Sequence, residues 1–209
     1  ITSGAGVNFY ERSLIQASSI TFEYVGSGNN FTSALPENGG IPIQANEVIE
    51  DADSFEGNAA KKASEVALAK NLPVFSDDSG LCVNVLDGRP GIFSARYGGP
   101  GLDDKGRCLK LLAELDGESN RQAHFACAIA IASPDGKVLG TTYGKCEGNL
   151  ATEIHGDQGF GHDPLFIPKG FQKSFAELGK DTKNSLSHRK NALEIAISTG
   201  LFNQLKEFQ

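Results

Sequence analysis

The chain has 209 residues, of which 39% are hydrophobic and 22% charged, an ordinary balance for a globular protein. No apolar run approaches the roughly 20 residues that a helix needs to cross a bilayer, so the sequence predicts a soluble protein with no membrane partner. Nineteen Lys and Arg residues against 26 Asp and Glu residues give a net charge of −7, and we therefore expect no binding to nucleic acid. A small phosphate ligand is compatible with this charge, because it needs only a few local cations or backbone N–H groups.

The cysteines and the N-terminus both bear on the cellular compartment. The four cysteines are widely spaced and form no Cys-x-x-Cys pair: Cys82, Cys108, Cys127 and Cys146. This spacing favours free thiols over a structural zinc site. The first residues lack the charged segment and apolar stretch of a secretory signal. Both observations predict a cytoplasmic protein.

The first fifty residues are rich in Gly, Ser and Asn and carry only a weak pattern. We expect a short helix over residues 8–16 and a strand over residues 20–25. Residues 26–30 and 36–40 have the composition of a turn and a loop.

A firmer helical pattern begins at Ser54. Four apolar residues recur at helical spacing: Ala59, Ala63, Val66 and Ala67. The pattern predicts a helix that ends near residues 71–73. Residues 73–76 then indicate a short buried strand and residues 81–86 a second strand, with the Asp-Asp-Ser-Gly segment of residues 77–80 between them.

Residues 88–101 are rich in Gly and Pro and predict a structured loop. Asp103 or Asp104 can cap the next helix, which ends at residues 116–117 and has one apolar stripe, formed by Cys108, Leu111, Leu112 and Leu115.

The last third of the chain predicts a hairpin and a helix. Residues 123–131 alternate large and small side chains as a strand does, and the turn at 134–136 leads into a second strand at 138–143. Ser187 can cap a final helix that presents Ala192, Leu193, Ala196 and Ile197. No internal repeat and no long linker divides the chain, so we expect one domain over residues 1–209.

Acidic side chains gather at two places. Asp77 and Asp78 follow an apolar strand, where open α/β sheets tend to present ligands. Neighbours on a strand point to opposite faces, so these two acids must have different roles. Glu50 lies in a second acidic cluster, and Glu50 with Asp78 would suffice for Mg²⁺, which takes its other ligands from water and phosphate. Each segment taken alone also fits a solvated acidic turn.

Two later segments carry aromatic and basic side chains. In residues 159–164, Phe160 or His162 would stack on a planar base while Asp163 contacts its edge; a well-packed structural turn is the alternative. Lys183 precedes a helix start, and His188 and Arg189 lie in the first turn of that helix. Basic side chains oppose the helix dipole there unless an anion or an acceptor lies nearby, which favours a functional role.

In this order, these segments resemble the inosine triphosphate pyrophosphatase family, which hydrolyses non-canonical purine nucleoside triphosphates. The resemblance runs from about residue 50 to the C-terminus, and its matching segments are Phe55 with Asn58 and Ala59, then residues 77–81, 86–97, 159–164, 176–178 and 183–189. It implies an α/β fold, an elongated mixed β-sheet with flanking helices and two lobes around a central nucleotide-binding cleft. It also implies a homodimer.

The resemblance further implies site residues and a reaction. Asp78 matches the catalytic acid, and Glu50 and Asp78 match the ligands of Mg²⁺. The implied nucleotide-binding residues are Ser3, Asn8, Ser79, Phe160, Gly161, His162, Asp163, Lys183, His188 and Arg189. The implied reaction is attack of water between the α and β phosphates of inosine triphosphate (ITP), dITP or XTP, which releases pyrophosphate and a monophosphate.

The N-terminus departs from the family pattern. Ser3 and Ala5 stand in its Thr-x-Asn segment, and Asn8 stands in place of a lysine, which removes a cation from the triphosphate. Gly57 replaces the glutamate that usually precedes Asn58. Two alternatives therefore stay open: a pyrophosphatase for other modified nucleotides, and a catalytically weakened nucleotide-binding protein.

Overall fold

The computed structural model of the chain describes residues 23–25 and 48–208. The helix expected over residues 8–16 and the turn and loop expected before residue 41 lie outside these residues, as do Ser3 and Asn8. Of the strand expected over residues 20–25, the last three residues form β1.

Within the described residues, five strands form one mixed sheet in the order β1-β2-β3-β4-β5. Their bounds are β1 Glu23–Val25, β2 Val74–Val83, β3 Gln122–Ala132, β4 Val138–Leu150 and β5 Phe166–Pro168. β1 runs parallel to β2, whereas β5 runs antiparallel to β4. Helices accompany the sheet, so the predicted α/β class with a mixed sheet is confirmed.

The chain divides into two compact units. The first comprises the chain up to Asp78, residues 127–144 and the chain from Ala192 onward, and the second comprises residues 79–126 and 145–191. Several long elements pass from one unit into the other, namely β2, β3, β4 and α5 (His188–Ser198). The expectation of a single domain over residues 1–209 stays a prediction.

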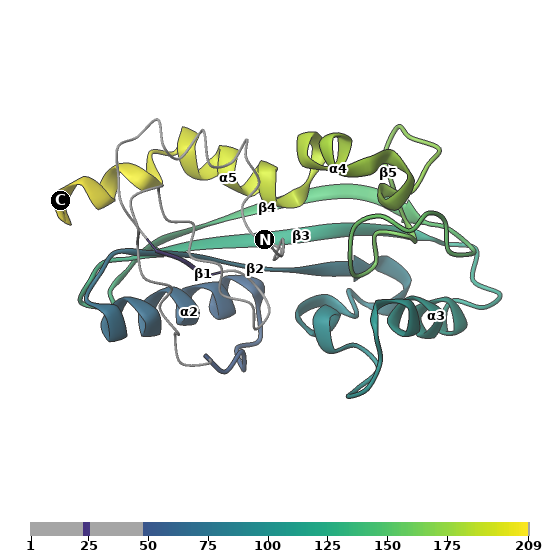
Figure 1. Ribbon diagram of the computed structural model, residues 1–209, viewed down its shortest axis with the longest axis horizontal. Helices are drawn as coiled ribbons and strands as arrows, with labels where there is room; N and C mark the ends of the chain where they lie inside the picture. The colour runs from purple at the N-terminus through teal and green to yellow at the C-terminus, as the bar shows by residue number, and fades with distance from the viewer. Residues whose placement is uncertain (1–22, 26–47, 209) are drawn as a thin grey trace. The chain divides into compact units, whose positions relative to one another are not determined.

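Helices cover both faces of the sheet in the first unit. Helix α2 (Phe55–Lys70) lies on one face, and the part of α5 from Ala192 lies on the other with η3 (Leu201–Phe208), as Figure 1 shows. The predicted stripe of α2 is buried, and because its residues are small the helix approaches β2 closely: the Ser76 hydroxyl donates to the Ala59 carbonyl at 2.5 Å. The core on the other face consists of Phe75, Cys127, Ile129, Ile131, Ala192, Leu193, Ala196, Leu201, Phe202 and Leu205.

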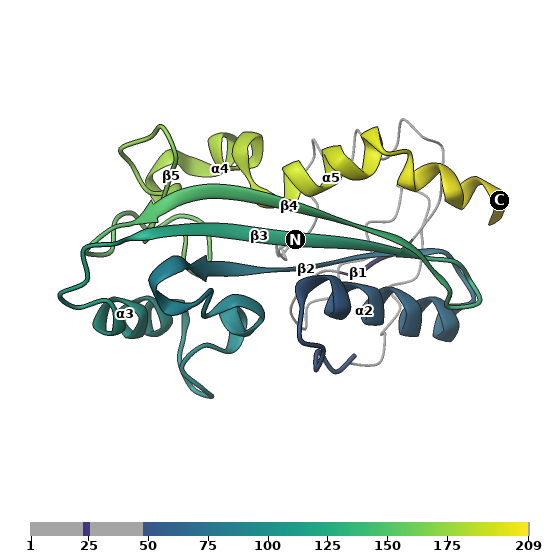
Figure 2. The same cartoon turned by 180° about the vertical axis from the view of Figure 1, so that it is seen from behind.

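The second unit has the same layered arrangement. In Figure 2, α3 (Asp104–Glu114) and α4 (Phe175–Leu186) lie on opposite faces of its part of the sheet. Two short 3₁₀ helices, η1 (Asn84–Leu86) and η2 (Gly91–Arg96), precede α3. The residues of this core with 0% exposure are Leu81, Val83, Leu111, Leu165 and Phe166.

Most predicted elements are confirmed, and their caps explain their ends. Ser54 caps α2 by accepting the Gly57 N–H, and the helix ends at Asn71 in the left-handed region. Asp103 caps α3, and Ser187 accepts the Lys190 N–H at the start of α5. The hairpin of β3 and β4 is present, with the Ser133 N–H bonded to the Lys137 carbonyl. All four cysteines are free, as expected, and they are buried.

Four expectations were wrong. Residues 77–80 are not a turn between two strands but the middle of the single strand β2. Residues 88–101 contain η2, and Ile197 is 42% exposed because it lies on the outer side of α5. Residues 84–86, expected in the second strand, form η1. Lys183 precedes the start of α5 as expected, and it lies in the last turn of α4, where the helix dipole favours a cation. No helix among the described residues is long and apolar enough to span a membrane.

Candidate active site

Asp78 is buried in the first unit and held by two side chains of α2. Its Oδ2 accepts a hydrogen bond from Asn58 Nδ2 at 3.1 Å, and its Oδ1 lies 3.5 Å from Lys62 Nζ. Burial raises the pKa of Asp78 to about 6, although the Lys62 ammonium acts in the opposite direction. The carboxyl group of Asp78 therefore titrates near neutral pH in this environment.

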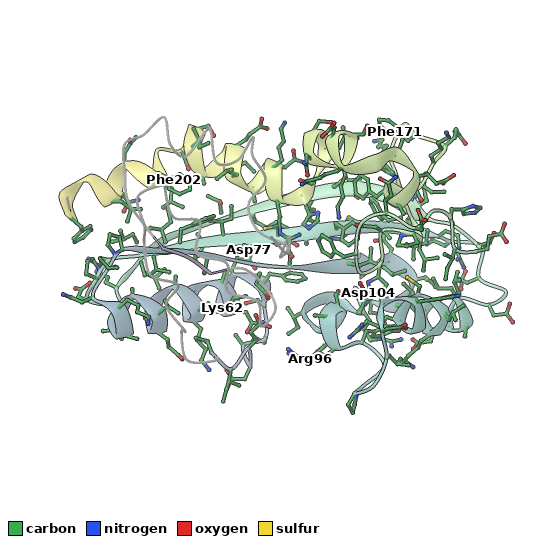
Figure 3. All side chains as sticks on the ribbon, in the orientation of Figure 1. Lys62, Asp77, Arg96, Asp104, Phe171 and Phe202 are labelled. Carbon is green, nitrogen blue, oxygen red and sulfur yellow. The ribbon has the colours of Figure 1, made fainter. Side chains whose placement is uncertain are left out.

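Asp77 has different surroundings, as expected for its position on the strand. Cys127 on β3 donates its thiol to Asp77 Oδ2 at 3.7 Å, and Cys127 belongs to the core beneath α5. Figure 3 labels Asp77 on β2 and Lys62 on α2. The two neighbouring acids thus contact opposite layers of the unit, which agrees with separate roles.

Lys62 joins the two carboxylates that sequence analysis assigned to a metal. Its Nζ lies 2.6 Å from Glu50 Oε1, and the Lys62 residue is only 3% exposed. Glu50 and Asp78 therefore both lie beside the Lys62 ammonium. Two carboxylates are the number with which proteins commonly hold Mg²⁺ that is shared with substrate phosphates, so this donor set fits such an ion. Among the described residues, no group of three or more His, Cys, Asp or Glu side chains is placed to hold a metal.

In the second unit, the start of α5 carries a neutral imidazole beside a guanidinium. The His188 ring stacks on Phe125, with centroids 4.9 Å apart and planes 18° apart, and it is buried. Burial lowers the pKa of His188 well below its usual value, and Arg189 and Lys183 add to the effect. Arg189 donates through Nη2 to Ser79 Oγ at 2.6 Å. This acceptor offsets the unfavourable position of Arg189 at a helix N-terminus.

The turn at residues 159–163 presents one aromatic ring and buries another. Phe160 is 47% exposed, and Lys183 Nζ lies 4.0 Å from the centroid of its ring. His162 is buried and packs edge-on against Tyr97. Asp163 is also buried, and its Oδ2 pairs with Lys183 Nζ at 2.5 Å. Of the two rings considered for stacking, the ring of Phe160 is the accessible one.

Comparison with known proteins identifies the family. The model of the Ham1 family matches residues 27–198. This chain belongs to the Ham1 family. The dITP/XTP pyrophosphatase of Desulfotalea psychrophila is 48% identical over 160 residues, which are 77% of this chain and 70% of that protein. The dITP/XTP pyrophosphatase of Bacillus subtilis is 47% identical over 150 residues, which are 71% of this chain and 75% of the relative.

A solved structure agrees with this assignment. The Ham1 protein of Staphylococcus aureus superposes with a TM-score of 0.70 at 38% identity, over 76% of this chain and 81% of that one. The resemblance inferred from the motifs is therefore confirmed.

In this Ham1 family member, the predicted site residues fall into two groups. Glu50 and Asp78 lie together in the first unit. The second unit holds Ser79, Phe160, Gly161, His162, Asp163, Lys183, His188 and Arg189. Sequence analysis gave no role to Lys62 or Asn58, although their spacing of four residues places both on one face of α2. The signal in the sequence that could have identified them is the presence of a lysine and an asparagine on the same helix face as the small apolar residues of α2.

Proposed function

We propose that this chain hydrolyses non-canonical purine nucleoside triphosphates, of which ITP, dITP and XTP are examples, to a monophosphate and pyrophosphate. Its membership of the Ham1 family and its identity to dITP/XTP pyrophosphatases support this proposal. The structural observation that carries it is the environment of Asp78, a buried carboxyl group with a pKa of about 6 beside Lys62 and Glu50.

In the proposed mechanism, Asp78 orients the attacking water and accepts its proton. A general base works best when its pKa lies near the operating pH, and burial brings Asp78 to that range. Asn58 binds Oδ2, and Lys62 Nζ lies 3.5 Å from Oδ1. Lys62, a buried cation on α2, stabilises the charge that develops on the phosphoryl oxygens. When bound to Glu50 and Asp78, Mg²⁺ would polarise those oxygens and neutralise part of their charge.

For the nucleobase, we propose contacts with the second unit. The exposed Phe160 offers a stacking surface, and the buried His162 and Asp163 belong to the same turn, in which Asp163 accepts the Phe160 N–H. His188, as a neutral imidazole, offers one donor and one acceptor, and Arg189 offers only donors. The 6-keto group of inosine and xanthosine accepts hydrogen bonds, whereas the 6-amino group of adenine donates them, so these donors favour the 6-keto purines.

Other parts of the proposal rest on the family resemblance alone. Ser3, Asn8, Ser79 and Gly161 are proposed to contact the nucleotide, Lys183 to neutralise its charge, and the chain to work as a cytoplasmic homodimer.

The test is pyrophosphate release from ITP with Mg²⁺. Asp78→Asn is nearly isosteric, and we expect it to lower turnover at least about 100-fold while the protein unfolds cooperatively. Asp77→Asn is the matched control and should lose less activity. EDTA should stop the reaction and added Mg²⁺ restore it. Binding of ITP without turnover would instead favour the catalytically weakened alternative, which the replacement of a family lysine by Asn8 suggests.

A further inference from the structure

Two carboxylates hold consecutive backbone N–H groups in the turn that carries Phe160. The Phe160 N–H donates to Asp163 Oδ2 at 3.0 Å, and the Gly161 N–H donates to Asp104 Oδ2 at 2.6 Å. Asp163 belongs to the turn itself, whereas Asp104 lies in the first turn of α3, where Figure 3 labels it. The backbone on both sides of the Phe160 side chain is therefore fixed.

A second contact joins α3 to the same peptide. Cys108, one helical turn after Asp104, donates its thiol to the Gly161 carbonyl at 3.4 Å. Both backbone polar groups of Gly161 thus bind side chains of α3. Gly161 has a φ of +60°, which an L side chain rarely adopts, and a Cβ at Gly159 would lie 2.2 Å from Asp163 Oδ2. The turn has little freedom to rearrange while these bonds hold.

Asp104 is not needed to cap its own helix. Asp103 is the cap of α3 and accepts the Gly106 N–H at 2.7 Å. The second oxygen of Asp104 pairs with Arg107 at 3.1 Å, and the side chain is 54% exposed, so Asp104 fills no part of the core. The bond to Gly161 leads from α3 to the Phe160 turn.

We propose that Asp104 is a positioning residue for nucleobase recognition. It holds the peptide between Phe160 and Gly161, and through it the exposed Phe160 ring, in the place where a purine stacks. This inference rests on the proposed function and adds to it a determinant on α3. Because the base lies far from the reacting phosphate in the covalent structure of the nucleotide, loss of this determinant weakens binding and leaves the chemical step intact.

The experiment compares Asp104→Ala with Asp104→Asn. Asn keeps an oxygen that accepts the Gly161 N–H, whereas Ala does not, and both remove the negative charge that favours the helix N-terminus. The matched control is Asp116→Ala, which removes an exposed carboxylate beyond the other end of α3. The measurements are the Kd of inosine monophosphate by calorimetry, KM and kcat for ITP, and inhibition by tripolyphosphate, which has no base.

We expect Asp104→Ala to raise the Kd of inosine monophosphate and the KM of ITP by a similar factor, about 3- to 10-fold. Its kcat and its inhibition constant for tripolyphosphate should stay within about twofold of wild type. Asp104→Asn and Asp116→Ala should resemble wild type throughout. Asp104→Ser, whose side chain is too short to reach Gly161, should behave as Asp104→Ala does and serves if the alanine variant does not fold.

Two results overturn this inference while wild type remains active: unchanged affinity of Asp104→Ala for inosine monophosphate, or an equal loss in Asp104→Ala and Asp104→Asn. The second result would reduce Asp104 to a charge that stabilises α3. A wild-type protein that neither binds inosine monophosphate nor releases pyrophosphate from ITP would overturn the proposed function, and the inference with it.

Discussion

Asn58 donates its side-chain N–H to Asp78 across 3.1 Å, and the two residues are 0% and 3% exposed. The carbonyl end of the same amide accepts the Ala52 N–H at 3.0 Å. If the Asn58 amide flipped by 180°, its oxygen and its nitrogen would exchange places, and both hydrogen bonds would be lost. The orientation of the Asp78 carboxylate is thus determined by α2 and by the loop that precedes it.

Replacing Asn58 with Leu should therefore reduce turnover more than it reduces stability. Asn58→Leu leaves Asp78 Oδ2 and the Ala52 N–H without their partner, which should lower the free energy of unfolding by about 1–3 kcal/mol. A carboxylate that is free to turn is misplaced for water activation, and we expect kcat for ITP to fall about 10- to 100-fold. Urea denaturation and initial rates measure the two effects.

Ser54→Ala provides the matched control for Asn58→Leu. It removes the N-cap of the same helix, at a cost of about 1 kcal/mol, and does not touch Asp78. Its kcat should remain close to that of wild type. If both variants lost the same fraction of activity, Asn58 would act through the stability of α2 alone.

A second prediction uses two neighbouring lysines that differ in burial. Lys62 pairs with Glu50 and Asp78 in the interior, whereas Lys61 pairs with Asp51 at the surface. Lys62→Met leaves two acids without their buried cation, so the free energy of unfolding should fall by about 3 kcal/mol or more. Since Lys62 lowers the pKa of Asp78, its loss should raise that pKa further and shift the acidic limb of the rate profile to higher pH.

Lys61→Met is the control for this pair. Surface ion pairs contribute little, so its stability and its pH–rate profile should match those of wild type. Denaturant titration and kcat measured from pH 5 to 9 would separate the two lysines. Identical behaviour of both variants would contradict a role for Lys62 at Asp78.

The local patterns predicted the elements that depend on local interactions. The apolar spacing of α2, the caps at Ser54 and Ser187 and the hairpin turn were each visible in a few consecutive residues. Helix α4 was missed because it is interrupted: Gly179 has φ 79° and ψ 171° inside it, so no single helical period runs through the segment. The continuity of β2 was missed for another reason, since Asp77 and Asp78 look like a turn until their distant partners are known.

The candidate site follows the same division. Motifs singled out Asp78, Phe160, Lys183 and Arg189, because the family resemblance lies in short contiguous segments, and the roles of these residues stay predictions. A contact between distant segments leaves no such pattern in the sequence. Asp104 and Gly161 are 57 residues apart in the chain, and no single motif contains both. Only the folded chain brings such pairs together.

A third prediction concerns purine selectivity. A donor that faces adenine loses its partner at the 6-amino group, which costs roughly 1–3 kcal/mol, so ATP should be used about 10- to 100-fold less efficiently than ITP. Arg189→Ala should lower kcat/KM for ITP and reduce the ratio of kcat/KM for ITP to that for ATP. The Mg²⁺ requirement should be unchanged. Ser79→Ala removes an acceptor that holds Arg189 and should have the same effect to a smaller degree. An equal loss on both nucleotides would assign Arg189 to phosphate binding or to structure.

The last prediction is a pH dependence of stability that comes from His162. Burial lowers the pKa of this imidazole from 6.5 to about 4, so below pH 6.5 the unfolded chain binds a proton that the folded chain excludes. The stability from this group is present above pH 6.5 and is lost as the pH falls toward 4. The shift corresponds to about 3 kcal/mol of unfolding free energy.

His162→Phe isolates this effect, because a phenyl ring can keep the edge-on contact with Tyr97 and does not titrate. Between pH 7.5 and pH 4, the unfolding free energy of the variant should fall by about 3 kcal/mol less than that of wild type, as measured by urea denaturation at each pH. Both proteins retain the buried His188, so its contribution to the pH dependence of the unfolding free energy is the same in each and cancels in the comparison. If His162→Phe and wild type lost equal stability on acidification, His162 would be protonated in the folded protein, and its burial as a neutral imidazole would be wrong.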